Sequence, residues 1–363
     1  MIPILLAFLG FCALIVLHEA GHFTAAKLVG MRVERFSLFF GNPLVSFRKG
    51  ETQYGIGWLP LGGYVRITGM NPAEEIPREA EGRAYFQMPV WKRVFVIAAG
   101  PFVNIVIAFV IIWALLLSNG RTTNDFVVAQ QGLGQPAAQF LQPNDRVISV
   151  DGVRGDPTTI ARQVARHRCA GRQVNGCMAT TAATVVVDRS GTLHTFDITP
   201  RYDATRGIDR TRLGFSYTNG TATVGPANAA SLSASGMWDV TKRTVSTFAK
   251  LFEARDRKQV SGIVGTSETL RQSFAFSTSL ALQVLALISL SLAIVNLFPF
   301  LPLDGGHIFW ALVEKARGGR AVSFAVMEKA GMVGFALVIV LFLIGLTNDI
   351  GRISDGTLGQ IPK

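Results

Sequence analysis

Two histidines and a glutamate near the start of the chain have a spacing that suits metal chemistry. His18, Glu19 and His22 lie in the sequence HEAGH. Residues four apart share one face of a helix, so both imidazoles can bind one Zn²⁺ ion. Glu19 lies beside them and can act as a general base on a water molecule that the metal acidifies. The trio therefore predicts metal-assisted hydrolysis.

A catalytic zinc site usually has three protein ligands and one open position, so a third ligand must come from elsewhere. The chain has five histidines, and His167 and His194 fall in a separate β-rich region. The remaining candidates are Asp304, His307 and Glu314. Asp304 is the first choice because it follows a proline-broken segment that can aim it inward. His307 is the second choice, as a ligand, as a partner of a ligand or as the start of the next helix.

The segment that begins at Asn296 needs its own explanation, because it interrupts apolar sequence. Pro299 and Pro302 break a helix, while Gly305 and Gly306 allow close approach of the backbone. Irregular backbone at membrane depth is tolerated where it lines a cavity. Asn296 offers an amide to a substrate backbone or a developing oxyanion. Its alternative role is a cap or an interhelical hydrogen bond.

Composition places these residues in a membrane protein. The chain has 363 residues, of which 49% are hydrophobic and 16% charged, whereas soluble domains carry about 25% charged residues. The apolar residues gather in four blocks. The length of each block is near the roughly 20 residues that a membrane-spanning helix needs. The fold class is thus a polytopic α-helical membrane protein with the lipid bilayer as partner. The four expected spans are residues 1–29, 91–118, 275–306 and 320–347.

The net charge of +11 fits the positive-inside rule better than nucleic-acid binding, because no aromatic-interleaved basic motif is present. Basic residues concentrate between the first two spans and between the last two. We therefore expect those connections to be cytoplasmic. Both termini, including residues 348–363, and the long middle connection are then extracytoplasmic.

Short strands are expected on the cytoplasmic side, in residues 30–90. Alternating apolar residues predict strands at 45–48, 52–58 and 64–67, with a turn at 60–63. Together they form a β-hairpin or small sheet at the membrane surface.

The middle connection divides into a β-rich domain at residues 126–217 and a following segment at 218–274. Within the latter, residues 218–236 predict a linker and residues 237–256 an amphipathic helix, lying on the membrane or packed on its own domain. Cys169 and Cys177 flank a glycine-containing loop in an oxidising compartment, and we expect a disulfide between them.

These features together resemble the site-2 protease family of intramembrane zinc metalloproteases, in the bacterial branch that contains the regulator-of-sigma-E protease. HEAGH is similar to the first family motif, and the segment from Asn296 to Gly306 to the second, with Asp304 as third zinc ligand. Further similarity lies in Pro60–Arg66, Ala99–Asn104, Gly134–Gly152 and Ser261–Gly265. The third of these resembles part of a PDZ domain. Only one PDZ-like unit is present, and Asn144 and the cysteine pair depart from the family pattern.

The resemblance implies cleavage within the transmembrane segment of single-pass proteins already trimmed by another protease. Anti-sigma factors and signal-peptide remnants are the implied substrates, in the bacterial inner membrane with the active site toward the cytoplasm. Gly62, Gly63 and Tyr64 would offer an edge strand to the unwound substrate. The PDZ domain would exclude untrimmed ectodomains.

Two other functions fit parts of the pattern. An ion or metal transporter could use the same His, Glu and Asp residues, and a catalytically inactive relative could hold substrates through its PDZ module. Replacement of Glu19 by Gln separates them, since only a protease should keep zinc and lose cleavage.

Overall fold

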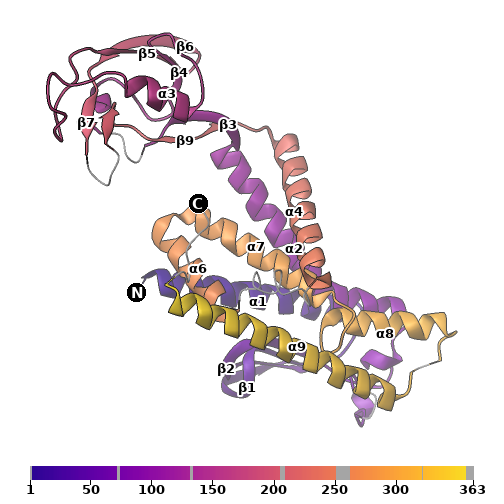
Figure 1. Ribbon diagram of the computed structural model, residues 1–363. Coiled ribbons are helices and arrows are strands. Elements are labelled where there is room, and N and C mark those ends of the chain that lie inside the picture. The colour runs from indigo at the N-terminus through magenta and orange to yellow at the C-terminus, as the bar shows by residue number, and fades with distance from the viewer. Residues whose placement is uncertain are drawn as a thin grey trace. The chain divides into compact units, whose positions relative to one another are not determined.

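The computed structural model describes residues 2–71, 74–130, 134–204, 209–250, 262–320 and 322–356 (Figure 1). It divides into two compact units. The first contains Met1–Leu115 and Pro226–Lys363, and the second contains Leu116–Gly225.

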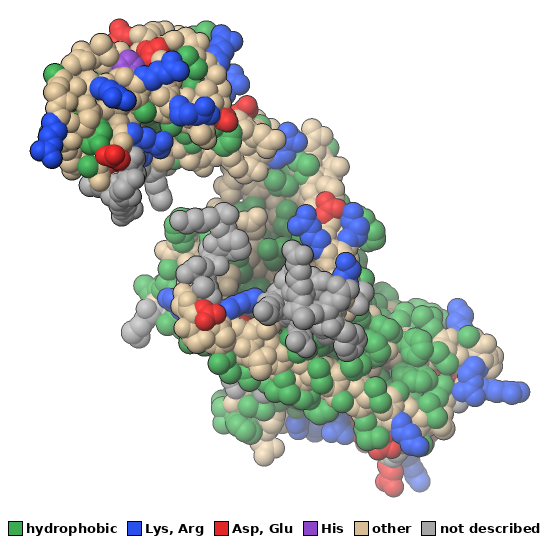
Figure 2. Space-filling model, viewed as in Figure 1, with side chains coloured by type: hydrophobic (Ala, Val, Ile, Leu, Met, Phe, Trp, Pro, Cys, Tyr) green, Lys and Arg blue, Asp and Glu red, His purple; other side chains and the backbone are tan. Residues whose placement is uncertain are grey.

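The first unit is mainly helical. Within the described residues, four helices are long and apolar enough to cross a membrane: α1 (Ile2–Leu28), α2 (Val90–Asn119), α7 (Thr278–Asn296) and α9 (Phe324–Ser354, with its apolar span counted from Ala325). Hydrophobic side chains cover much of the outer surface of this unit, including the region of α8 and α9 (Figure 2). An apolar exterior is what a bilayer solvates, so the structure agrees with a multi-pass membrane protein.

Among the residues that the structure describes, the first unit also contains the helices α4 (Pro226–Ala249), α6 (Ile263–Phe276) and α8 (Asp304–Ala316). α6 packs against α1 through Leu270, which joins a cluster with Ala7, Leu14 and Leu285. Two short 3₁₀ helices, Arg78–Ala80 and Tyr85–Gln87, precede α2.

The sheet of the first unit is built from two long strands, β1 (Val33–Lys49) and β2 (Thr52–Ile67). The first half of β1 pairs on both sides, for example Leu38 with Ile56 and with Gly63. β2 therefore crosses from one side of β1 to the other, and residues 63–67 form an outer edge. Residues 53–56 run parallel to residues 35–38, whereas residues 63–67 run antiparallel to the same segment. The chain therefore reverses direction between Ile56 and Gly63, as the turn expected at 60–63 requires, although the strand assignment is continuous there.

The second unit is a β-rich domain. Its sheet has the antiparallel order β6–β5–β4–β3–β9, formed by Thr192–Ile198, Ala183–Arg189, Arg146–Val150, Arg121–Val128 and Tyr217–Ala222. A second pair joins β7 (Arg201–Asp203) to β8 (Arg210–Arg212), and α3 spans Pro157–Val164, with a short 3₁₀ helix at Ala137–Gln139. Val150, Ile160, Val185 and Ile198 lie in one buried core.

The expectation of a linker at 218–236 is wrong. Residues up to Ala222 complete β9, and Pro226 already begins α4. Polar and glycine residues have weak strand propensity, but pairing with β3 along the sheet edge overrides it. The same pairing extends the domain beyond the expected 126–217, because β9 runs from Tyr217 to Ala222.

The amphipathic segment is helical to Ala249, and residues 251–261 lie outside the described part of the chain. Met237 and Val240 pack against Ala108 of α2 and Leu290 of α7. Trp238 is exposed. α4 thus packs against helices of the first unit through one face.

Two span boundaries also differ from expectation. The third span ends at Asn296, because Pro299 and Pro302 stop α7, and Asp304 begins a separate helix. The fourth span continues to Ser354, so the first residues of the expected 348–363 tail are helical. The last residues of α9 are less apolar than the rest of the helix, but they continue its backbone hydrogen bonds.

Candidate metal centre

Three side chains from two distant parts of the chain meet in the first unit. His18 and His22 project from α1, and Asp304 is the first residue of α8. The Nε2 atoms of the two histidines are 3.2 Å apart. Each lies 3.3 Å from Oδ2 of Asp304. Both histidines are buried, with 6% and 7% of their surface exposed.

This triangle has the dimensions of a zinc site. Zn²⁺ binds imidazole nitrogen and carboxylate oxygen at about 2.0–2.2 Å in a tetrahedron, so its ligand atoms lie about 3.3–3.5 Å apart. The three observed separations of 3.2, 3.3 and 3.3 Å are close to one face of such a tetrahedron. Oδ2 of Asp304 is buried and accepts no hydrogen bond from a described residue. Three converging lone pairs are unfavourable unless a cation neutralises them, and the residues present fit zinc.

Local sequence explains how Asp304 reaches the histidines. After α7 ends, the chain turns back on itself through bonds such as Leu303 N to Phe300 O. A side chain at Gly305 would collide with the Leu297 carbonyl. Glycine is therefore needed for the turn to close, and the turn returns Asp304 to the end of α7.

His22 is oriented by α2. Its Nδ1 lies 2.9 Å from the backbone carbonyl of Val96. The carbonyl can only accept, so Nδ1 carries the hydrogen and Nε2 keeps the lone pair that a metal needs. Pro101 lies in the same part of α2 and has no N–H for the helical bond to the Ile97 carbonyl. Gly100 leaves room for the ring, since a Cβ there would lie 2.6 Å from Cε1 of His22.

His18 is oriented by a residue to which the sequence analysis gave no role at the site. Asn104 of α2 is fully buried, and its side-chain amide lies 3.2 Å from Nδ1 of His18. The two ends of an amide are exchanged by a rotation of about 180°. The amide oxygen can accept the Nδ1 proton that a metal-binding imidazole carries. The sequence could have pointed to Asn104, because it is a polar residue within the second apolar span and polar residues are costly there.

Glu19 lies between the histidines and the sheet. A Cβ added to Gly63 would be 3.0 Å from Cγ of Glu19, so the edge of β2 passes directly against this side chain. The arrangement leaves the carboxylate beside the metal ligands but outside the triangle that they form. A general base needs this position.

Of the other predicted site residues, Asn296 reaches the metal centre, whereas Gly62 and Tyr64 contact Phe40. Asn296, the last residue of α7, reaches the centre, with Nδ2 3.4 Å from Nε2 of His18. Gly62 packs against Phe40, and Tyr64 stacks on the same ring and accepts a hydrogen bond from Arg35.

The other ligand candidates, Glu314 and His307, and the histidine His167 that the sequence analysis set aside all lie in other surroundings. Glu314 forms an ion pair with Arg93. His307 is not part of the cluster of metal-binding groups found among the described residues. His167 pairs with Asp151 in the second unit.

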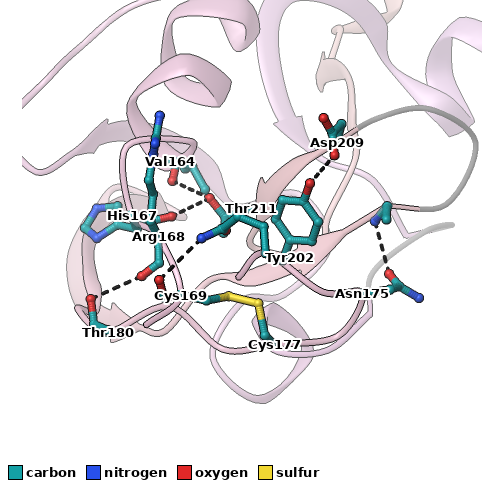
Figure 3. The surroundings of a disulfide bond; sticks show 12 residues. Val164, His167, Arg168, Cys169, Asn175, Cys177, Thr180, Tyr202, Asp209 and Thr211 are labelled. Atoms are coloured by element: carbon teal, nitrogen blue, oxygen red, sulfur yellow. Dashed lines mark hydrogen bonds between the residues drawn. A yellow bond between two sulfur atoms is a disulfide. The ribbon is translucent and has the colours of Figure 1, made fainter. Parts of the chain in front are cut away.

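Cys169 and Cys177 form a disulfide in the second unit (Figure 3). It lies next to the contact in which the Thr211 hydroxyl donates to the carbonyls of Val164 and His167.

The fold and the site define a multi-pass helical membrane protein with a buried His–His–Asp metal centre. Residues 6–341 match the model of peptidase family M50. The chain therefore belongs to this family, the site-2 proteases, and is a zinc metalloprotease of that family.

Its relatives carry matching names. It is 30% identical over 391 residues to zinc metalloprotease Rip1 of Mycobacterium tuberculosis, covering 93% of this chain and 94% of the relative. A Campylobacter jejuni protein named "Putative zinc metalloprotease Cj1068" is 29% identical over 353 residues, covering 94% and 91%.

Proposed function

We propose that this protein hydrolyses peptide bonds within the transmembrane segments of single-pass membrane proteins after another protease has trimmed them. The observation that carries the proposal is the position of His18, His22 and Asp304 inside a unit of membrane-grade helices. Anti-sigma factors and signal-peptide remnants are substrates of the required form. Regulated intramembrane proteolysis is the corresponding process.

His18, His22 and Asp304 would hold the zinc ion, and Glu19 and Asn296 would act on the substrate. When bound, zinc acidifies a water molecule and polarises the scissile carbonyl. Glu19 accepts the proton of the attacking water and delivers it to the departing nitrogen. Asn296, 3.4 Å from His18, donates a hydrogen bond to the oxygen on which negative charge develops.

The edge of β2 presents the substrate to this centre. A helical peptide bond is shielded by its own hydrogen bonds, so the substrate must unwind before attack. Residues 63–67 pair with β1 on one side only, and Gly63 touches Glu19. An unwound substrate can add there as a strand and place its backbone beside the general base.

The proposed membrane arrangement is that of the inner membrane, with the metal centre toward the cytoplasm. His18 and His22 lie in the second half of α1. Lys27 is in the last turn of this helix, and Arg32 and Arg35 follow its end. The second unit and both termini are then extracytoplasmic.

We propose that the second unit is a PDZ domain whose groove binds the carboxyl terminus of the trimmed substrate. A groove of about 360 Å³ lies between α3 and residues 210–217. β9 is an edge strand beside it. The N–H groups of Leu213, Gly214 and Phe215 donate to no described residue, whereas the carbonyls of the first two accept bonds from Ala137 and Gly134. Consecutive free N–H groups of this kind capture a terminal carboxylate.

The cleavage proposal is tested with purified protein in liposomes and a trimmed single-pass substrate. Glu19→Gln should retain zinc and lose cleavage, while Glu81→Gln, an exposed change, should cleave normally. Mass spectrometry should locate the cut within the transmembrane segment. Flux of metal ions with no cleavage would favour a transporter, and a wild-type protein that binds but never cuts would favour an inactive holding protein.

The groove proposal is tested by binding of a peptide to the full-length protein. A peptide that ends like the trimmed substrate should bind, and the same peptide with an amidated terminus should not. Equal binding of both peptides would contradict capture of the carboxylate.

A further inference from the structure

The two ends of α8 make polar contacts with other helices. Within the described part of the chain, its side chains make polar contacts at two places only. Asp304 at its first residue meets the two histidines, and Glu314 in its last turn meets Arg93. Ten residues separate the two points, which is about 15 Å along a helix.

The contact at the far end is specific. The two terminal nitrogens of Arg93 donate to the two carboxylate oxygens of Glu314 at 2.6 and 3.0 Å. Arg93 is 7% exposed and its guanidinium lies 6.0 Å from the ring centre of Tyr85. A bidentate pair fixes orientation as well as distance, and solvent screens it less because Arg93 is buried and Glu314 partly buried.

Arg93 belongs to α2, and α2 also orients the two histidines of the metal centre. Arg93 is in the first turn of α2, and Val96, which binds His22, is one turn further along. Asn104, which contacts His18, follows on the same helix. α2 is therefore linked to all three zinc ligands, to two of them directly and to Asp304 through α8.

We propose that the Arg93–Glu314 pair is a positioning device for the metal centre: it sets the place of α8 so that Asp304 meets the two histidines at zinc-binding distance. Neither residue touches the metal, and both act through the helix. The inference rests on the metal centre and is independent of the substrate proposed above.

Two variants separate positioning from folding. Glu314→Asp keeps the charge, so Arg93 stays paired, but its side chain is shorter by one methylene and must draw α8 toward α2. The double change Arg93→Met with Glu314→Met removes the largely buried pair without leaving an unpaired charge, a replacement that is often neutral or stabilising for the fold. Lys315→Met is the matched control, because Lys315 is the exposed neighbour of Glu314.

The measurements are zinc affinity, by competition with a chelator in detergent, and the visible absorption spectrum of the Co²⁺-loaded protein. We expect both pair variants to unfold at or near the wild-type temperature without metal, and to bind zinc 10–100-fold more weakly, as for other residues that orient ligands. Their Co²⁺ bands should weaken as tetrahedral geometry is lost, while Lys315→Met should match wild type. Zinc affinity within threefold of wild type and an unchanged Co²⁺ spectrum in both pair variants would overturn the proposal.

Discussion

Replacement of Gly100 by Ala tests the geometry of the centre with a single methyl group. A Cβ at this position would lie 2.6 Å from Cε1 and 2.7 Å from Cδ2 of His22. Carbon atoms pack at about 3.5–4.0 Å, so the ring must move by about 1 Å. Zinc sites tolerate about 0.2 Å in ligand distance. The methyl group should therefore displace His22, one of the three proposed ligands.

We expect the zinc dissociation constant of Gly100→Ala to rise by at least about 100-fold, or about 2.7 kcal/mol. Alanine favours a helix by about 1 kcal/mol over glycine, so a loss of helix stability cannot explain that result. The assay is chelator competition in detergent, with circular dichroism as the check on folding.

Gly351→Ala in α9 is the control, because a Cβ there meets nothing within 4 Å. It should bind zinc as wild type does. Wild-type zinc affinity in Gly100→Ala would refute the reasoning, since it would mean that the His22 ring does not occupy the place described.

Three further predictions concern residues around the centre and in the second unit. Asn104→Ala should weaken zinc binding 10–100-fold with unchanged helix content, measured by competition and circular dichroism; unchanged affinity would exclude its role in orienting the histidine it touches. Burial raises the pKa of Asp145, but bonds from Arg189 and a backbone amide outweigh it, so the pKa lies below its usual range. The resulting stability is present above pH 4 or so and is lost as pH falls through the lower folded-state pKa. Arg189→Gln should cost about 3 kcal/mol and remove this pH dependence, as read by hydrogen exchange of β4 and β5; retention of the dependence would contradict it. Reduction of Cys169–Cys177, eight residues apart, should destabilise the same strands by about 2.5 kcal/mol, and unaltered exchange would argue against it.

The three proposed metal ligands could be predicted from the sequence because metal-binding side chains are costly where these residues occur. His18 and His22 have helical spacing in an apolar segment, and Asp304 follows a proline-broken stretch in another. Each is expensive in a membrane unless it is used. The four spans were likewise visible from length and hydropathy.

The parts that sequence reasoning missed depend on contacts between distant elements. Val96 binds His22 through its backbone, which no residue type reveals. Glu314 was considered as a ligand, but only the packing of α8 against α2 shows that Arg93 occupies it. β9 was predicted as linker because its strand depends on pairing with β3 rather than on its own composition.

Zinc K-edge X-ray absorption on the purified protein tests the central claim most directly. The account predicts one zinc ion per chain, with two imidazole nitrogens and oxygen ligands at about 2.0–2.2 Å. In Asp304→Ala, the two imidazoles should remain and the carboxylate contribution should disappear. A sulfur-containing shell, or a spectrum that Asp304→Ala leaves unchanged, would contradict a centre shared by α1 and α8.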